Sequence, residues 1–375
     1  MSTPPLRIGP LTVAPPVVLA PMAGVTNAAF RRLCRSFGAG LYVSEMVSGR
    51  ALLQDNVTTN RMVGFAADEA VRSVQLYVVD PDVAAAAVRR VIEVSDVHHV
   101  DLNMGCPSPK VTRRGGGAAL PVRHRLVGAI VAAAVHAAEG VPVTVKMRMG
   151  VDEDTLTYIE AGRAARDAGA AALALHARTA EQLYSGRADW AAVGRLKEAV
   201  TDIPVLGNGD IWDARDALEM MRTTGCDGVV VGRGCLGKPW LFRDLVDAFD
   251  GRPVRSAPLL GEVTAVMRRH ARLLVEAKGD EGMAVRDFRK HVGWYLTGYP
   301  VGGPRRRALA CSSSLAELDM LLDALDPEAA LPPGAERLPR GHLQGPRPVT
   351  LPEGWRASAD DASPPDGAEL FVSGG

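Results

Sequence analysis

The sequence places a cysteine where an apolar strand is expected to end. The segment Val97–Leu102 is followed by Asn103 and then by Gly105-Cys106-Pro107, so a thiol stands at the end of a buried strand. A thiol has an ordinary pKa of about 8.5, and it can act as a nucleophile when deprotonated or as a proton donor when protonated. A small buried core residue is the other interpretation of any single cysteine. The flanking glycine and proline favour a reactive position.

Cationic side chains follow two neighbouring predicted strands. Lys146 and Arg148 stand two residues apart at the end of one strand, and His176 and Arg178 do the same on the next. Residues spaced in this way point to the same side of a strand. The two pairs would repel each other, and burial of an unpaired ammonium group is unfavourable, unless an anion lies between them. We therefore expect an anionic cofactor or substrate at this position.

Glycine-rich turns follow the last two predicted strands. They read Gly207-Asn208-Gly209-Asp210-Ile211 and Val231-Gly232-Arg233-Gly234. Barrels often bind a phosphate after their seventh and eighth strands, through backbone N–H groups and a short helix N-terminus. The two turns together predict a phosphate site.

These side chains require a scaffold that brings many strand ends to one place. Apolar runs with the spacing of βα units alternate with helical segments, and they read as strands that are covered on both faces. Eight such units in about 240 residues predict a closed (β/α)8 TIM barrel. A doubly wound sheet is the rival, but Ala20–Thr26 after the first strand contains no GxGxxG. The predicted strands are Val17–Ala20, Leu41–Val43, Val74–Val78, Val97–Leu102, Val141–Val145, Ala171–Leu175, Ile203–Leu206 and Gly228–Val231.

The remainder of the chain has a different pattern. We expect a barrel over residues 1–250, a helical domain over 251–326 and a disordered tail rich in Pro, Gly and acidic residues over 327–375. Ten Lys/Arg and five Asp/Glu lie between Glu262 and Ala310, whereas four Arg and eleven acids follow from Cys311 onward. Predicted helices in the second region are Glu262–Lys278, Glu281–Leu296 and Leu315–Leu325.

Composition limits the class of protein. The net charge is zero, which argues against a general nucleic-acid binder, and no apolar run is long enough to span a bilayer. The N-terminus has no signal-peptide pattern. Five scattered cysteines without a CxxC pair favour a reducing cytoplasm, and we expect neither a disulfide framework nor a metal site.

Six motifs in this order resemble the flavin-dependent tRNA-dihydrouridine synthases, most closely the B-type bacterial enzymes. The resemblance covers about residues 8 to 310. The motifs are Ala20-Pro21-Met22-Ala23-Gly24, Asp101-Leu102-Asn103-Met104-Gly105-Cys106-Pro107, Val145-Lys146-Met147-Arg148, His176-Ala177-Arg178-Thr179, Gly207-Asn208-Gly209-Asp210-Ile211 and Val231-Gly232-Arg233.

The resemblance implies an FMN site at the barrel mouth. Hydride would pass from FMN to C6 of a uracil, and Cys106 would donate the proton to C5. Lys146 would lie near N1/O2 of the flavin, where reduced flavin is anionic. The other residues implied to bind the cofactor are Pro21, Met22 and Ala23 along the ring, Gln75 at its polar edge, His176 at the flavin or the base, and Asn208, Gly209, Asp210, Gly232 and Arg233 at the phosphate.

The resemblance also implies a tRNA substrate and a nicotinamide dinucleotide, NADPH or NADH, as the electron donor. The segment Lys110–Gly117 would close over a uridine that has left its stack. The basic helical domain would bind backbone phosphates. Residues expected to contact the substrate are Asn103, Arg148, Arg178, Arg289 and Lys290.

Two alternatives stay open at this point. A TIM-barrel flavin oxidoreductase could act on a small molecule such as dihydroorotate or an enoate, although such an enzyme does not need a basic helical domain. An RNA-binding module with a vestigial barrel is the other alternative. The clustered cations and Cys106 argue against this alternative, because a barrel that has lost its catalytic activity has no need of them.

Overall fold

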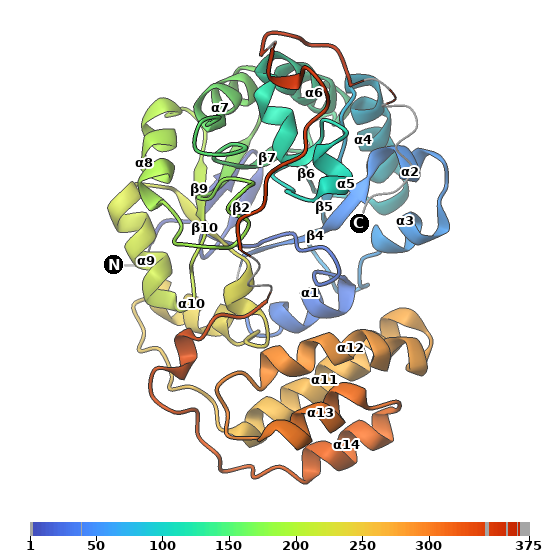
Figure 1. The fold of residues 1–375 in the computed structure, drawn as a ribbon, viewed down its shortest axis with the longest axis vertical. Helices are drawn as coiled ribbons and strands as arrows, with labels where there is room; N and C mark the ends of the chain where they lie inside the picture. The colour runs from blue at the N-terminus through green and yellow to red at the C-terminus, as the bar shows by residue number, and fades with distance from the viewer. Residues whose placement is uncertain (1–2, 39, 342–344, 358, 366, 368–375) are drawn as a thin grey trace.

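The computed structural model describes residues 3–38, 40–341, 345–357, 359–365 and 367. Eight parallel strands form a closed barrel, in the order β10-β3-β4-β5-β6-β7-β8-β9, which confirms the predicted TIM barrel (Figure 1). Each predicted strand is present within a few residues of its expected bounds. The strands are β3 (Val17–Leu19), β4 (Leu41–Ser48), β5 (Ser73–Tyr77), β6 (His99–Met104), β7 (Val143–Arg148), β8 (Ala172–His176), β9 (Val205–Asn208) and β10 (Gly228–Val231).

Helices surround the barrel and cover the outer face of the strands. Several begin at a side-chain cap that satisfies an otherwise unpaired backbone N–H group. Asn27 accepts a hydrogen bond from Phe30 N at 3.0 Å, and Asp213 and Asp216 form a capping box. The helices of this layer are α1 (Ala28–Arg35), α2 (Gly49–Leu53), α3 (Val57–Met62), α4 (Pro81–Ser95), α5 (Pro109–Thr112), α6 (His124–Ala137), α7 (Tyr158–Asp167), α8 (Trp190–Ala199), α9 (Ala214–Thr224) and α10 (Leu241–Phe249).

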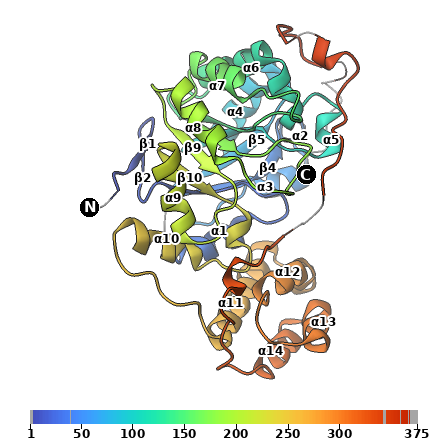
Figure 2. The same ribbon diagram turned by 60° about the vertical axis from the view of Figure 1, so that its left-hand side comes forward.

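An N-terminal hairpin, β1 (Leu6–Ile8) and β2 (Leu11–Val13), was not expected from the sequence. Leu6, Ile8 and Val13 are buried in one cluster with barrel residues such as Leu41 and Val230. In Figure 2 the hairpin lies on the opposite side of the barrel from the C-terminal segment. The hairpin therefore covers one end of the barrel and leaves the carboxyl ends of the strands as the open mouth.

A second group of helices follows the barrel. It consists of α11 (Leu260–Lys278), α12 (Glu281–Tyr295), α13 (Gly303–Cys311) and α14 (Leu315–Asp323), of which α13 was not expected. These helices share a hydrophobic cluster with Ala29 and Leu33 of α1 and with Trp240, so the group is attached to the barrel through α1 (Figure 1).

The described part of the C-terminal segment lies on the barrel, whereas residues 342–344, 358, 366 and 368–375 of the expected disordered tail lie outside the described residues. Residues 345–357 run along the barrel, where Trp355 is 2 % exposed and Arg340, earlier in the segment, is also buried (Figure 1). Val349 and Leu351 pack against the barrel core. The composition was misleading because a few apolar residues, spaced among Pro, Gly and acids, are enough to hold an extended segment on an existing surface. Within the described part of the chain, no helix has the length and apolar character of a membrane span.

Candidate active site

A cavity of about 540 Å³ opens at the carboxyl ends of the barrel strands. This is the end at which TIM barrels carry their chemistry, and the volume is typical of a small-molecule site. Apolar atoms from Ala20, Val25, Met46 and Val230 line one part of it. The predicted site residues that line the cavity are Pro21, Met22, Ala23, Gln75, Asn103, Cys106, Lys146, Arg148, His176, Asn208, Gly209, Asp210, Gly232, Arg233 and Lys290.

The register of the strands brings these residues together from distant parts of the sequence. Asn103 of β6 is paired with Lys146 of β7, and Arg148 of β7 is paired with His176 of β8. His176 is in turn paired with Asn208 of β9. The predicted polar residues thus form neighbouring rows at the mouth, because parallel strands in register end at the same level.

Four hydrogen bonds to the backbone of Gly105 and Cys106 fix the position of Cys106. The side-chain oxygen of Asn103 accepts hydrogen bonds from Gly105 N at 3.2 Å and Cys106 N at 2.9 Å. Arg148 Nε donates to Gly105 O at 3.0 Å, and Ala118 N donates to Cys106 O at 3.0 Å. The thiol is therefore held on a short turn that is braced from β6, from β7 and from the following loop.

The surroundings of Cys106 favour the protonated thiol. Burial raises the pKa of Cys106, while a backbone hydrogen bond from Ser108 and the charge of Arg148 lower it to a smaller extent. A cysteine nucleophile needs the opposite shift, since the thiolate is the reactive form. The site thus suits a cysteine that donates a proton and later recovers it.

Lys146 is partly buried within a polar network at the mouth. Its Nζ donates to Asn208 Oδ1 at 3.1 Å, and Asn208 is anchored by a hydrogen bond of 2.7 Å to Val230 O. Burial lowers the pKa of Lys146, and burial raises that of nearby Asp101. An anion beside Lys146 would therefore be stabilised by a poorly solvated cation.

Gln75 is oriented by the same network. Its Nε2 donates to Asp101 Oδ2 at 2.6 Å, and its Oε1 accepts from Asn103 Nδ2 at 2.8 Å. Thr144 Oγ1 donates to the other carboxylate oxygen of Asp101 at 2.6 Å. The amide of Gln75 consequently has a defined orientation toward the mouth.

His176 is held as a neutral ring. Burial lowers its pKa well below the ordinary value, and the charges of Arg148, Lys146, Arg178 and Arg233 lower it further. A neutral imidazole can donate one hydrogen bond and accept another, and an imidazolium cannot accept. His176 is thus suited to hydrogen bonding with a polar ligand rather than to charge pairing.

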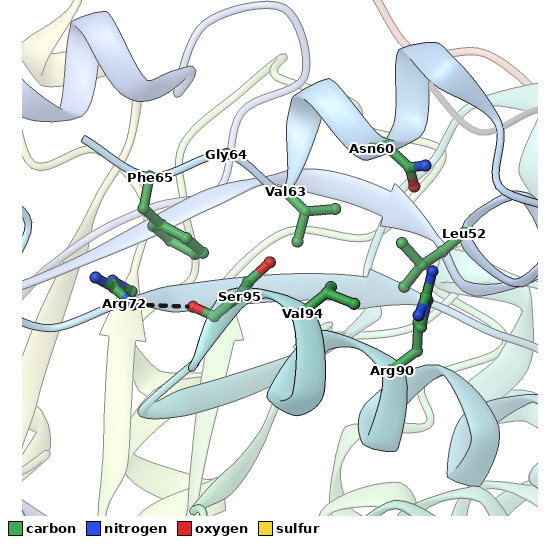
Figure 3. A pocket seen from close by; sticks show the side chains of 9 residues that line it. All are labelled: Leu52, Asn60, Val63, Gly64, Phe65, Arg72, Arg90, Val94 and Ser95. Atoms are coloured by element: carbon green, nitrogen blue, oxygen red, sulfur yellow. Dashed lines mark hydrogen bonds between the residues drawn. The ribbon is translucent and has the colours of Figure 1, made fainter. Parts of the chain in front are cut away.

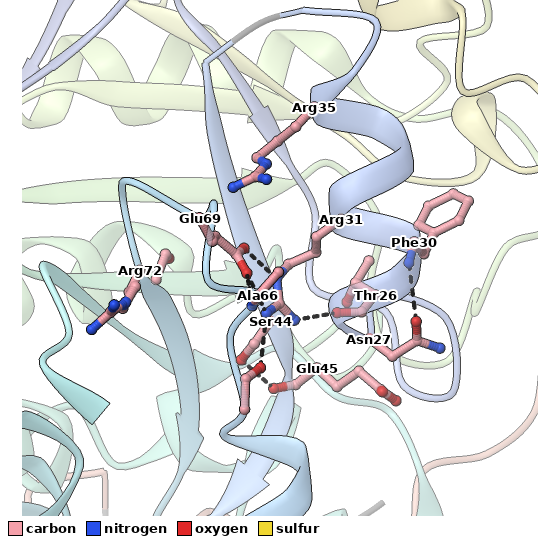
Figure 4. Close-up of polar contacts among 12 residues, drawn as sticks. Thr26, Asn27, Phe30, Arg31, Arg35, Ser44, Glu45, Ala66, Glu69 and Arg72 are labelled. Carbon is pink, nitrogen blue, oxygen red and sulfur yellow. Dashed lines mark hydrogen bonds and ion pairs between the residues drawn. The ribbon is translucent and has the colours of Figure 1, made fainter. Parts of the chain in front are cut away.

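The turn after β3 is fixed by a network that Figure 4 shows in part. Thr26 Oγ1 accepts a hydrogen bond from Met22 N at 3.0 Å, and the carboxylate of Glu45 accepts one from Gly24 N. Below this turn, Arg31 donates to Thr26 O at 2.9 Å and forms a buried ion pair with Glu69 at 2.7 Å (Figure 4). The apolar turn that lines the cavity is therefore held from behind by charged groups.

The turns after β9 and β10 form the opposite side of the mouth. Asp210 lies between two guanidinium groups, with Arg178 at 2.8 Å and Arg233 at 3.5 Å. A Cβ on Gly209, which has a φ of +130°, would lie 2.7 Å from Ala188 Cβ, so this position requires glycine.

One observation indicates that this side of the mouth fits a phosphate. Nη1 of Arg178 is buried and has no hydrogen-bond partner among the described residues. It lies 3.8 Å from the ideal Cβ position of Gly209. A buried guanidinium donor without an acceptor is unfavourable, and a phosphate oxygen would satisfy it.

The structure places the four cations that were expected to contact the substrate in different surroundings. Arg148 donates to the carbonyl oxygens of Gly105, Thr179 and Leu183, so most of its donors hold loops together. Arg178 is 1 % exposed, pairs with Asp210 and is not among the described residues that line this cavity, which is inconsistent with the expected contact to RNA. Arg289 donates to the carbonyl oxygens at the end of α13, whereas Lys290 reaches the cavity.

Three lining residues were missed at the sequence level. The Tyr184 ring centroid lies 4.3 Å from the Arg233 guanidinium, and the Trp212 ring lies 5.2 Å from it. Trp294 of α12 lines the cavity from the helical domain. Tyr184 lies eight residues beyond His176, and no pattern of strand ends could identify it.

Another cavity, of about 460 Å³, lies on the flank of the barrel between α3 and α4 (Figure 3). Leu52, Val63 and Phe65 line it together with Arg72, which donates to Ser95 O at 3.3 Å. None of the predicted site residues lines this cavity. The predicted site residues therefore gather at the barrel mouth and not at this flank.

The fold and the mouth together define a TIM-barrel enzyme with a partly buried cysteine opposite a cluster of cations. A model of the dihydrouridine synthase family matches residues 18–330 of the chain. The chain belongs to this family, which confirms the resemblance in the sequence.

The relatives agree with this assignment. The chain is 56 % identical to a probable tRNA-dihydrouridine synthase of Mycobacterium tuberculosis over 100 % of its own length and 98 % of the relative. It is 41 % identical to tRNA-dihydrouridine synthase B of Pseudomonas syringae pv. tomato, over 81 % of the chain and 89 % of the relative. The solved structure of a histamine dehydrogenase from Rhizobium sp. 4-9 is similar to this chain with a TM-score of 0.53 at 12 % sequence identity. The match covers 85 % of this chain and 63 % of the dehydrogenase chain, and it shows a similar fold only.

Proposed function

We propose that the protein reduces the 5,6-double bond of uridines in tRNA, with FMN at the barrel mouth and NADPH or NADH as the electron donor. The observation that carries the proposal is the cavity at the barrel mouth, which brings the thiol of Cys106 together with Lys146 and the turns after β9 and β10. Burial raises the pKa of Cys106, which favours the protonated thiol. Membership of the dihydrouridine synthase family supports the choice of substrate.

FMN, when bound, would supply hydride to C6 of the uracil. Pro21, Met22 and Ala23 would pack along its ring, and Gln75 would hydrogen-bond the polar edge. Lys146 would stabilise negative charge that develops on the ring, because its cation is partly buried and poorly solvated. His176, held neutral, would hydrogen-bond the ring or the uracil.

The phosphate of FMN would bind at the turns after β9 and β10. The unpaired Nη1 of Arg178 offers a donor to a phosphate oxygen, in addition to Asn208, Gly209, Gly232 and Arg233. Asp210 would hold Arg178 and Arg233 in place rather than contact the phosphate, since two anions would repel each other.

Cys106 would protonate C5 of the uracil. The substrate carbon becomes basic as hydride arrives at C6, and a positioned thiol can transfer its proton to it. Asn103 holds the backbone N–H of Cys106, and Arg148 holds the carbonyl of Gly105, so both residues position the acid. Solvent would return the proton to the thiolate between turnovers.

The helical domain would bind the RNA. Lys290 and Trp294 connect it to the mouth, and Lys290 Nζ lies 3.8 Å from the ideal Cβ position of Gly24. A uridine has to leave its stack to reach this depth. Other exposed cations on these helices could contact the phosphates of the RNA backbone. They are Arg269, Arg286, Arg305 and Arg307. A cytoplasmic location stays a prediction.

The proposal is tested by the colour of the purified protein. We expect flavin absorbance that bleaches anaerobically with NADPH and returns on addition of tRNA that lacks dihydrouridine. A protein that binds no flavin would refute both this function and a small-molecule flavin oxidoreductase. Reoxidation by orotate or by an enoate, with no response to tRNA, would favour the latter.

The raised pKa of Cys106 predicts a pH dependence. Iodoacetamide reacts with the thiolate, so a raised pKa shifts the midpoint of alkylation to a higher pH than that of free cysteine. The thiol therefore remains available as an acid at pH 8. Alkylation of Cys106, followed by mass spectrometry between pH 6 and 11, measures the midpoint. A midpoint below that of free cysteine would indicate a nucleophile instead.

A further inference from the structure

The C-terminal segment lies on the loop that follows Cys106. Trp355 is 2 % exposed, and its Nε1 donates to Ala119 O at 2.8 Å. An ideal Cβ on Gly115 would lie 2.7 Å from Cη2 of the Trp355 ring, so the indole rests on the backbone of Gly115. In Figure 1 this red segment crosses the barrel from the side of the helical domain toward α6.

The three glycines of this loop each make room for a different neighbour. A Cβ on Gly115 would meet Trp355, and a Cβ on Gly116 would lie 2.4 Å from Tyr77 Cε2. A Cβ on Gly117 would lie 2.4 Å from Cys106 O, and Ala118 N donates to the same carbonyl. The glycine run is therefore a thin layer of backbone between the indole and the turn that carries the thiol.

Polar contacts lie on both sides of Trp355, two ion pairs after it and a backbone hydrogen bond before it. Arg356 pairs with Asp152 in the loop after β7, and Arg123 pairs with Asp361 at 2.7 Å. The Arg123 guanidinium also lies 3.8 Å from the centroid of the Trp355 ring. Before Trp355, Arg347 N donates to Glu181 O at 2.9 Å in the loop after β8. The segment thus bridges the loops that follow β6, β7 and β8.

We infer that Trp355 is a positioning residue for the acid Cys106, acting through Gly115–Ala119. This inference rests on the proposed function of Cys106 and adds a part of the chain that the barrel motifs do not include. The three atoms nearest to an ideal Cβ on Gly115 all belong to the Trp355 ring, so loss of the indole removes the packing that presses the loop toward the cysteine.

Trp355→Ala tests the inference in the full-length protein. We expect reduction of the flavin by NADPH to be unchanged, because that step does not use the thiol. Reoxidation by tRNA should slow about 10-fold or more, since small displacements of a reacting group are costly. Alkylation of Cys106 by iodoacetamide should become about threefold faster or more as the thiol becomes more exposed. Cys311, which is exposed, is the internal reference.

Matched variants separate positioning from loss of folding. Trp355→Phe keeps a ring against Gly115 and should recover much of the rate with tRNA. Gly115→Ala keeps Trp355 but places a methyl group against its ring, and should reproduce the effect of Trp355→Ala. Arg356→Ala removes only a partly exposed ion pair and should leave both readouts unchanged.

Two results would overturn the inference. One is Trp355→Ala with unchanged Cys106 alkylation and unchanged reoxidation by tRNA. The other is an equal slowing of the NADPH and tRNA steps, which indicates general destabilisation. Failure of the proposed function is distinguishable, because the alkylation rate reports the position of the loop even if Cys106 proves not to be the acid.

Discussion

Cys106→Ala is expected to lose reduction of RNA while the protein keeps its flavin and still oxidises NADPH. The substitution removes the proton donor, and a positioned general acid contributes about 10²- to 10⁴-fold to rate. The backbone contacts of the turn do not involve the side chain, so the local structure should persist. Stopped-flow spectroscopy of the flavin, with NADPH and tRNA added in separate steps, measures both half-reactions.

A matched substitution provides the control for this prediction. Cys311→Ala removes a free thiol that is exposed on α13 and far from the cavity lining, and should leave both half-reactions unchanged. If Cys106→Ala reduces tRNA at the rate of the unmodified protein, another group supplies the proton and the assignment is wrong.

Arg31→Met should destabilise the protein by about 3–5 kcal/mol, since it leaves a buried carboxylate without its partner. The Arg31 side chain is fully buried, and Glu69 is 2 % exposed. Arg31 also donates to Thr26 O, and this hydrogen bond helps to hold the turn that lines the cavity (Figure 4). A further hydrogen bond runs from Arg31 to Gly64 O. We therefore expect weaker retention of flavin in the purified protein as well. Urea unfolding measures the change in the free energy of unfolding.

Two controls test the physical reason for this loss. The double variant Arg31→Met/Glu69→Leu removes both charges and should recover much of the lost stability. Arg222→Met removes one partner of the exposed pair with Glu219 and should leave the free energy of unfolding nearly unchanged. A loss below about 1 kcal/mol in Arg31→Met would show that the buried pair contributes little.

Much of the barrel could be predicted because the apolar runs and their spacing along the sequence indicate the same βα pattern. Short apolar runs at βα spacing specify strands that are covered on both faces, and all eight are present. The polar residues at their ends could be predicted for the same reason, since strands in register bring their ends to one mouth. The positions of the predicted strand ends therefore placed Lys146, His176 and Asn208 at the barrel mouth from the sequence alone.

Tertiary contacts could not be read in the same way. Arg178 was expected to face RNA, but it is buried against Asp210, a residue 32 positions later that no local pattern links to it. Tyr184 enters the mouth from a loop. Trp355 lies in a stretch whose composition suggests disorder, and its position depends on contacts with Gly115, Ala119 and Arg123 that are distant in sequence.

The Gly115–Gly117 run shows how structure explains a sequence feature. In the sequence three glycines suggest a mobile loop. In the structure each glycine lies against a different group, and Gly117, with a φ of +54°, approaches the carbonyl oxygen of Cys106. Glycine serves close packing at these positions as much as flexibility.

The most direct test of the proposed function is the oxidation of the reduced protein by tRNA. The protein is reduced with NADPH without oxygen, freed of excess NADPH and mixed with tRNA that lacks dihydrouridine. We predict that flavin absorbance returns and that the amount of dihydrouridine formed equals the amount of flavin reoxidised. Both changes should be lost in Cys106→Ala. Flavin that stays reduced with this tRNA, but is reoxidised by a small enoate, would contradict the proposed function.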